Sequence, residues 1–202
     1  MLVPRKVSQT AVTSTFVPFA VLLSSALLAA ERAEALDHSR LLYSSWVSLV
    51  LAIPALCLFV FPATRNSDYE RLTWTWSYVA YLIHFYYAFG LTYGWSFART
   101  YSSQGAAIAT NNFLVTAIWT FDVATSWSVR RSYRWLEIER WVTRLFVFVT
   151  FVVSSVFIFH GFVRLLGISM MAAVILCVVA RIVQVAGTGG GLIPKVHPMP
   201  RR

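Results

Sequence analysis

Apolar residues along this chain fall into six runs, each about as long as a membrane-spanning helix, with short polar segments between them. A helix rises about 1.5 Å per residue, so roughly 20 apolar residues cross the hydrocarbon core of a bilayer. The runs are 11–30, 41–62, 73–99, 111–129, 142–163 and 165–186. This pattern predicts an all-α fold, a polytopic transmembrane helical bundle of about six spans.

The first run allows a second interpretation. It follows Arg5 and Lys6, and Ala33-Glu34-Ala35 resembles the cleavage site of a signal peptide, which would leave five spans. We favour a first spanning helix, because the run is long for a signal sequence and further apolar runs follow. The pattern predicts one transmembrane domain over 1–186 and a flexible, basic tail over 187–202 that is rich in Gly and Pro.

Composition and charge support a membrane protein. With 58% hydrophobic and 12% charged residues, the chain is far from the balance of a water-soluble domain. The net charge of +9 is concentrated in the segments between the apolar runs, which is typical of membrane topology and excludes a nucleic-acid-binding stripe. Most of the Lys and Arg residues fall on one side of a six-span arrangement, which predicts cytoplasmic termini and a multi-pass protein of the inner (plasma) membrane.

Two ionisable residues inside the apolar runs are candidates for a buried polar site. His84 lies near the middle of the third run, and Asp122 lies in the fourth. An ionisable side chain at this depth is costly unless a partner receives it. Helical rise places the two at about 15 and 10 Å from the same surface, so we expect His84 and Asp122 to form a hydrogen-bonded or ionic pair. Such a pair can tie two helices together or relay protons.

The residues near this pair extend the predicted site. At helical spacing, the hydroxyl groups of Tyr81 and Tyr87 fall within one turn of His84. Polar neighbours on the fourth run are Asn111 and Asn112. Farther along the third run, Gly90 and Gly94 form a GxxxG step, which predicts close approach of another helix backbone.

Histidines also permit a cofactor or metal site, although the identity of any cofactor is left open. Haem b could be held between His84 and His160, but the predicted depths of these two residues differ by about 10 Å, which counts against a shared haem. An outer-surface metal site could combine His38 and its neighbour Asp37 with His160. No spacing in the sequence fixes these ligands on one helix face.

A dense basic segment follows the fourth run. Its five arginines are Arg130, Arg131, Arg134, Arg140 and Arg144. Aromatic and aliphatic residues alternate with them, which predicts a segment in the lipid headgroup layer that faces lipid or a partner protein. The alternative is ordinary topology-setting charge.

No motif of a soluble enzyme or metallohydrolase occurs, and the polar segments are too short for a soluble active site. We therefore expect an integral, non-catalytic subunit or accessory protein of a larger membrane complex, with the lipid bilayer and other membrane subunits as partners. Two alternatives remain. One is a haem-bearing electron-transfer subunit that uses His84 and His160, and the other is a small proton-coupled transporter or channel that uses His84 and Asp122.

Overall fold

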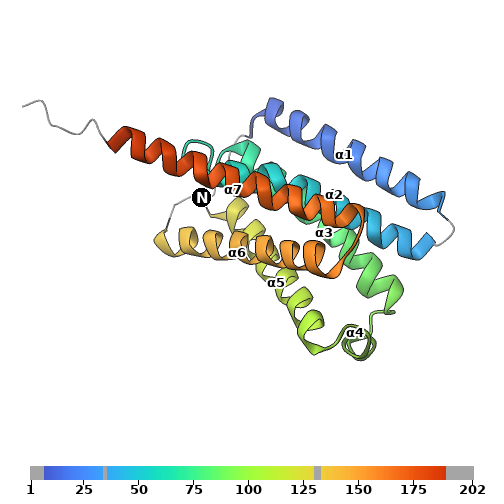
Figure 1. The fold of residues 1–202 in the computed structure, drawn as a ribbon. Helices are drawn as coiled ribbons and strands as arrows, with labels where there is room; N and C mark the ends of the chain where they lie inside the picture. The colour runs from blue at the N-terminus through green and yellow to red at the C-terminus, as the bar shows by residue number, and fades with distance from the viewer. Residues whose placement is uncertain (1–6, 34–35, 130–132, 190–202) are drawn as a thin grey trace, which may run out of the picture.

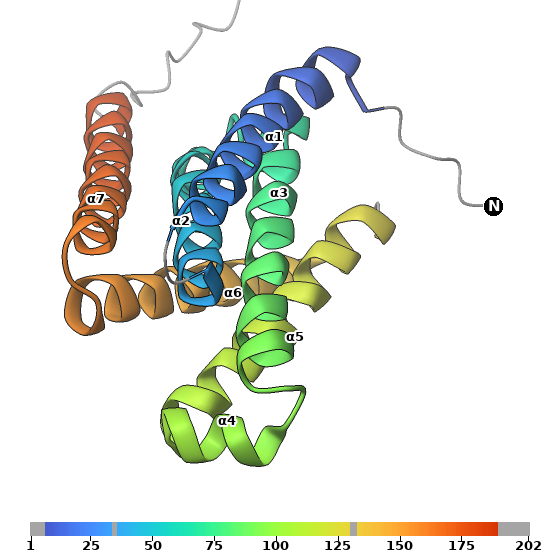
Figure 2. The same ribbon diagram turned by 90° about the vertical axis from the view of Figure 1, so that its right-hand side faces the viewer.

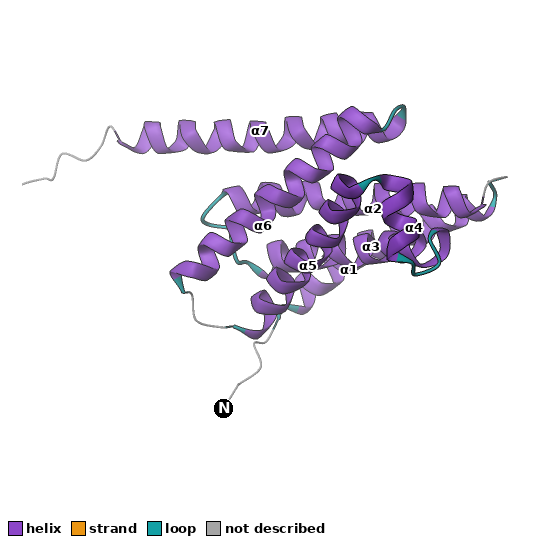
Figure 3. Cartoon of the chain, turned by 90° about the horizontal axis from the view of Figure 1, so that it is seen from below, coloured by secondary structure: helices purple, strands orange, loops and turns teal. Residues whose placement is uncertain are grey.

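A computed structural model describes residues 7–33, 36–129 and 133–189, and every regular element in these ranges is helical (Figures 1 and 3). The elements in chain order are α1 (Gln9–Glu31), α2 (Leu36–Val60), α3 (Asp68–Phe85), the π-helical segment η1 (Tyr86–Thr92), α4 (Phe97–Gln104), α5 (Ala106–Ser128), α6 (Arg134–Val152), the π-helical segment η2 (Val153–Ile158) and α7 (Phe162–Gly189).

Four helices of the described chain are long and apolar enough to cross a membrane, which indicates a membrane protein. Their ranges are Gln9–Glu31, His38–Val60, Arg134–Ile158 and Phe162–Gly187. Helices α3 and α5 fall outside this group, because α3 begins with several charged residues and α5 contains two asparagines and an aspartate. The predicted helical membrane fold is confirmed. That α3 and α5 also span the membrane, which would give six spans, remains a proposal.

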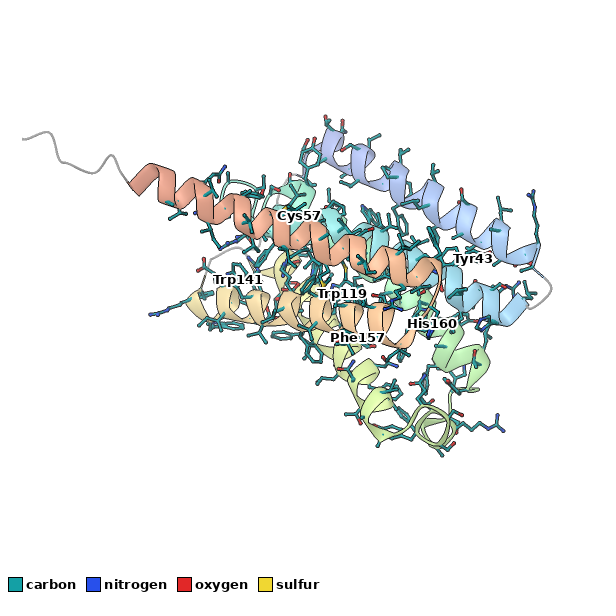
Figure 4. The ribbon with its side chains drawn as sticks, viewed as in Figure 1. Tyr43, Cys57, Trp119, Trp141, Phe157 and His160 are labelled. Carbon is teal, nitrogen blue, oxygen red and sulfur yellow. The ribbon has the colours of Figure 1, made fainter. Side chains whose placement is uncertain are left out.

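Helix α2 lies at the centre of the bundle and packs against α1, α3 and α7, and α6 crosses it steeply (Figures 1 and 2). Side chains from α2, α3, α5, α6 and α7 form the main apolar core. In it, the ring centroids of Trp74 and Trp119 lie 4.6 Å apart. Trp119 has no exposed surface and lies centrally in Figure 4. The short helix α4 lies at one end of the bundle, beside the start of α5.

Local sequence signals set several helix ends. Ser8, Ser67 and Ser96 precede α1, α3 and α4, and each hydroxyl accepts a hydrogen bond from a backbone N–H of the first turn. These caps provide acceptors for N–H groups that have no partner within the helix. Between η2 and α7 the chain reverses at Gly161, whose φ of 64° costs little without a Cβ atom.

The prediction of one continuous helix over 73–99 is wrong. Helix α3 ends at Phe85, η1 continues only to Thr92, and a separate helix follows. The cause is in the backbone, because Gly94 and Trp95 take left-handed φ angles of 59° and 58°. The chain therefore turns here and does not continue along the axis of α3.

Three other predicted boundaries change. The polar segment 31–40 is helical from Leu36 onward, so α2 begins earlier than predicted. The predicted connection 100–110 is helical except at Gly105. The predicted headgroup segment also joins a longer element, since α6 runs without interruption from Arg134 into the apolar run. The reason is that the backbone hydrogen bonds of a helix can continue through polar residues at its start, so a helix can begin before its apolar run.

The nearest atoms to Gly90 and Gly94 belong to the residues that follow them in the chain, and the predicted close approach of another helix there stays a prediction. Gly90 lies beneath Trp95 of the same segment, and a Cβ atom at Gly90 would lie 2.8 Å from Cζ2 of that indole ring. The backbone N–H of Trp95 donates to the carbonyl of Phe89 at 2.9 Å. The two glycines therefore allow the chain to fold back on itself.

Helix α7 meets η2 at a very close contact. A Cβ atom at Gly167 would lie 2.0 Å from Oγ and 2.7 Å from Cβ of Ser155. Ser155 is buried, and its hydroxyl donates to the carbonyl of Phe151 at 2.5 Å. The absence of a side chain at Gly167 is what lets the two elements approach.

Candidate functional site

Asp122 of α5 is held by side chains from α6 and α3. Nη1 of Arg144 donates to both carboxylate oxygens of Asp122, at 3.0 and 3.1 Å. The indole Nε1 of Trp74 donates to Oδ2 of Asp122 at 2.6 Å. These partners satisfy a fully buried carboxylate. The predicted pairing of Asp122 with His84 is not formed.

Glu70 of α3 binds the other side of the same guanidinium. Nη2 and Nε of Arg144 donate to Oε1 of Glu70 at 2.7 and 3.2 Å. The guanidinium also lies 4.3 and 4.7 Å from the ring centroids of Phe59 and Trp74. Glu70 and Asp122 are 0% exposed and Arg144 is 3% exposed. We call Glu70, Asp122 and Arg144 the ion cluster; removing one member would leave an uncompensated buried charge.

The register between α3 and α5 explains why His84 and Asp122 do not meet. The hydroxyl of Tyr81 donates to the backbone carbonyl of Asn112 at 3.0 Å, and Trp74 reaches Asp122. Asp122 is therefore level with Trp74, which is about ten residues, or about 15 Å, along α3 from His84. The direct proton relay predicted between the two residues is absent.

His84 instead connects α3 to α2. Its Nδ1 lies 2.9 Å from the backbone carbonyl of Leu41. A carbonyl oxygen only accepts, so Nδ1 carries the hydrogen of this bond. Nε2 of His84 makes no hydrogen bond to the described part of the chain. The ring is thus oriented by its protein partner, with one nitrogen left for another group.

The five arginines predicted to form one basic surface have different surroundings. Arg130 and Arg131 lie outside the described residues, and Arg134 is exposed. Arg140 is half-buried and donates to a side chain in the turn before α3. Arg144 faces the interior, which corrects the prediction, because it lies about 15 Å along α6 from its first residue and within the bundle.

Arg65 adds a second cation among aromatic rings near the ion cluster. Its guanidinium lies 4.9 Å from the ring centroid of Phe59 and 4.8 Å from that of Trp141. Burial lowers the pKa of Arg65, and the negative charge of Glu137 opposes this shift. This end of the bundle is therefore held by cations that are stacked on rings as well as by ion pairs.

A cavity of about 400 Å³ lies beside His84, toward the other end of α3. Its walls come from α2, α3, α4, α5 and α6, and from both π-helical segments through residues such as Phe89 and Ser155. π-Helical turns are rare, and they occur frequently at functional sites. The volume is in the range of small-molecule pockets. This cavity is the candidate binding site.

The predicted polar neighbours of His84 divide between the cavity and its surroundings. Tyr81 and Asn112 line the cavity together with His84, whereas Tyr87 and Asn111 do not. Nδ2 of Asn111 lies 3.4 Å from Oγ1 of Thr150, a hydroxyl group of the lining. The sequence thus located three polar residues of the wall, although it misassigned the partner of His84.

The other candidate ligand residues lie elsewhere. His160 is exposed in the link between η2 and α7 and does not line the cavity (Figure 4). His38 is exposed near the start of α2. The described residues contain no group of three or more His, Cys, Asp or Glu side chains arranged to hold a metal ion. The structure therefore does not join His84, His160 and His38 in one site.

Glu70 was missed as a site residue, and Arg144 was predicted for the basic segment and not for a buried site. Arg144 lies three positions into an apolar run, 142–163, and a cation at that place is a signal for a buried partner. Glu70 gave no comparable signal, because it lies in a short charged segment before the third run. Its burial depends on how α3 packs against α6.

Together, the helical fold and the four apolar spanning helices place the chain in the class of polytopic helical membrane proteins. Comparison with protein-family models, with curated proteins and with solved structures found no match.

Proposed function

We propose that this chain is an integral membrane protein that binds a small, largely apolar ligand in the cavity beside His84. The observation that carries the proposal is the cavity of about 400 Å³ between the two π-helical segments. Concave, mostly apolar spaces with a few polar groups are the usual form of ligand sites. Phenylalanine side chains supply much of the wall, including Phe85, Phe113 and Phe151.

The rim of the cavity supports entry from the lipid phase. Ile108, Ile158 and Phe159 line the cavity and are 44%, 48% and 41% exposed. Thr92 and Ser103 are exposed elsewhere on the rim, but on the side of Ile108, Ile158 and Phe159 an apolar molecule could enter from the bilayer without crossing a polar layer. The ligand class that fits this route is one that already partitions into membranes.

We place this site in the outer half of an inner-membrane bundle with cytoplasmic termini. In this proposal α3 and α5 cross the membrane as well, which makes six spans. Charge distribution supports the orientation, because Arg65, Arg134 and Arg140 lie outside the apolar runs at the end of the bundle that is predicted to be cytoplasmic. His84 lies about 21 Å along α3 from Glu70, so the cavity belongs to the opposite half.

Photolabelling tests the proposed binding site. The protein in lipid nanodiscs would be irradiated with a phenyl-diazirine, and labelled peptides would be identified by mass spectrometry. We expect labelling of the cavity wall at Phe89 and Phe113 that excess naphthalene suppresses. Ala88→Phe places a ring in the cavity and should abolish this suppressible labelling.

Ala107→Phe is the matched control, because Ala107 is exposed at the start of α5 and does not line the cavity. It should label as the wild type does. Labelling that naphthalene does not suppress, or suppressible labelling that persists in Ala88→Phe, would contradict the proposal.

A second candidate function rests on the orientation of His84. Histidines that ligate metals commonly donate their other ring N–H to a carbonyl, as Nδ1 of His84 does to Leu41. This favours Nε2 as a ligand of a haem or metal in an electron-transfer subunit, although His160 does not share the cavity. An absorption spectrum and a metal analysis of protein purified from its native membrane test it: a Soret band supports haem, and the absence of both a Soret band and a bound metal removes this candidate.

The role of subunit or accessory protein concerns the outside of the bundle and is compatible with ligand binding. It remains a prediction, motivated by the short connections between helices. Identification of the chains that co-purify from native membranes in mild detergent tests it. Purification of this chain alone under those conditions would count against a stable complex.

A further inference from the structure

Most polar groups in the cavity wall already donate their hydrogens to the protein. The hydroxyls that donate to backbone carbonyls are those of Ser45, Ser48, Thr92, Thr100 and Ser155. The hydroxyl of Tyr81 does the same. A hydroxyl whose hydrogen is occupied can still accept a hydrogen bond. These hydroxyls therefore offer acceptors to a molecule inside the cavity, whereas the hydroxyls of Tyr93, Ser103, Thr150 and Ser154 keep hydrogens that a ligand could also use.

His84 is the strongest of these acceptors. Because Nδ1 carries the hydrogen that binds the carbonyl of Leu41, Nε2 of the neutral ring has a lone pair and no hydrogen. The bond to Leu41 also holds the ring in position. A ligand hydroxyl that reaches Nε2 would therefore meet a preorganised acceptor.

The rest of the lining excludes a charged ligand. Among the described residues that form the wall there is no Asp, Glu, Lys or Arg, and His84 is the one histidine. An ion transferred into such a wall would lose its hydration without gaining a counter-charge. Rings of Phe85, Phe89 and Phe113 contact one another in this wall, with Phe89 and Phe113 at 5.2 Å in a T-shaped arrangement. Aromatic walls favour a flat ring as the body of the ligand.

We infer that the ligand of this cavity is an uncharged aromatic alcohol of the phenol class, whose hydroxyl donates to Nε2 of His84. This inference rests on the proposed binding function and adds the chemistry that the site selects. The ring of the ligand packs against the phenylalanines, and its hydroxyl supplies a donor to Nε2 of His84, which has no partner in the described chain.

Competition between a phenol and its methyl ether tests this chemistry. Naphthol and its methyl ether have nearly the same ring and shape, but only naphthol donates a hydrogen bond. Each would compete with the phenyl-diazirine for the wild-type cavity in the same nanodiscs. We expect naphthol to compete at a concentration about three- to tenfold lower than the ether, as one net hydrogen bond provides.

Two substitutions at His84 test the acceptor Nε2 separately from the hydrogen bond between Nδ1 and the carbonyl of Leu41. His84→Asn keeps an amide N–H at the position of Nδ1, so it can still donate to Leu41, but it has no atom at the position of Nε2. His84→Gln places an amide oxygen near the position of Nε2 and loses the donor to Leu41. We expect the preference for naphthol to disappear in His84→Asn and to persist in part in His84→Gln.

Both probe concentrations are counted as concentrations in the membrane, which removes the difference in partitioning between the two probes. Equal competition by naphthol and the ether in the wild type would overturn the phenol assignment while leaving the binding site intact. An unchanged preference in His84→Asn would overturn the role of Nε2. Failure of both probes to compete would instead contradict the proposed function itself.

Discussion

Arg144→Met is expected to cause a large loss of stability. It leaves the carboxylates of Glu70 and Asp122, both 0% exposed, without their shared cation. Breaking a buried ion pair in this way costs about 3–5 kcal/mol in free energy of unfolding. Unfolding by sodium dodecyl sulfate in mixed micelles, followed by circular dichroism, measures the change.

Arg134→Met is the matched control, since Arg134 lies on the same helix and is exposed. We expect it to change the free energy of unfolding by less than about 0.5 kcal/mol. The triple variant Glu70→Gln, Asp122→Asn, Arg144→Met removes all three charges and should regain part of the lost stability. Equal stability of Arg144→Met and Arg134→Met would show that the ion cluster is not a buried network.

Gly167→Ala is expected to separate α7 from η2 and to lower the free energy of unfolding by about 1–3 kcal/mol, the usual cost of overpacking. The reason is steric, because the new methyl group would lie 2.0 Å from Oγ of Ser155. Ser155 lines the cavity, so the same substitution should weaken suppressible photolabelling there. Thermal unfolding in detergent measures the stability change.

Gly187→Ala provides the control on the same helix, because nothing in the described chain beyond the local backbone of α7 lies within 4 Å of the position that its Cβ would take. It should be neutral or slightly stabilising, since alanine favours helix. Combining Gly167→Ala with Ser155→Gly removes the atoms that clash and should recover part of the loss. A Gly167→Ala protein as stable as Gly187→Ala would mean that the two elements do not pack as closely as described.

The cavity and the ion cluster divide the bundle into two parts with different roles. Toward the predicted cytoplasmic end, Arg144 joins α3, α5 and α6 through charged hydrogen bonds. Toward the other end, the π-helical segments and the aromatic rings surround the cavity. The end of the bundle that contains the ion cluster can hold the walls of the binding site in place, while the apolar side of the rim admits the ligand.

Local patterns were sufficient for the apolar helices and insufficient for the break in the third run. Helices α1, α2, α6 and α7 follow from apolar residues at membrane-spanning length, because this property belongs to each segment by itself. The sequence pattern did not predict the turn at Gly94 and Trp95, because a continuous apolar run with aromatic residues predicts one helix. The left-handed backbone at this turn brings Trp95 onto Gly90, a contact between residues that the helical period does not bring together.

The amino-acid sequence alone determined that this is a helical membrane protein and that His84, Tyr81 and Asn112 are polar residues within its apolar part. Only the tertiary structure decided their partners: Leu41 for His84, and Arg144 with Trp74 for Asp122. The physical reason is that hydrophobicity and helical period act along one segment. The rotation and register of neighbouring helices depend on how bulky side chains such as Trp74 and Trp119 pack between them.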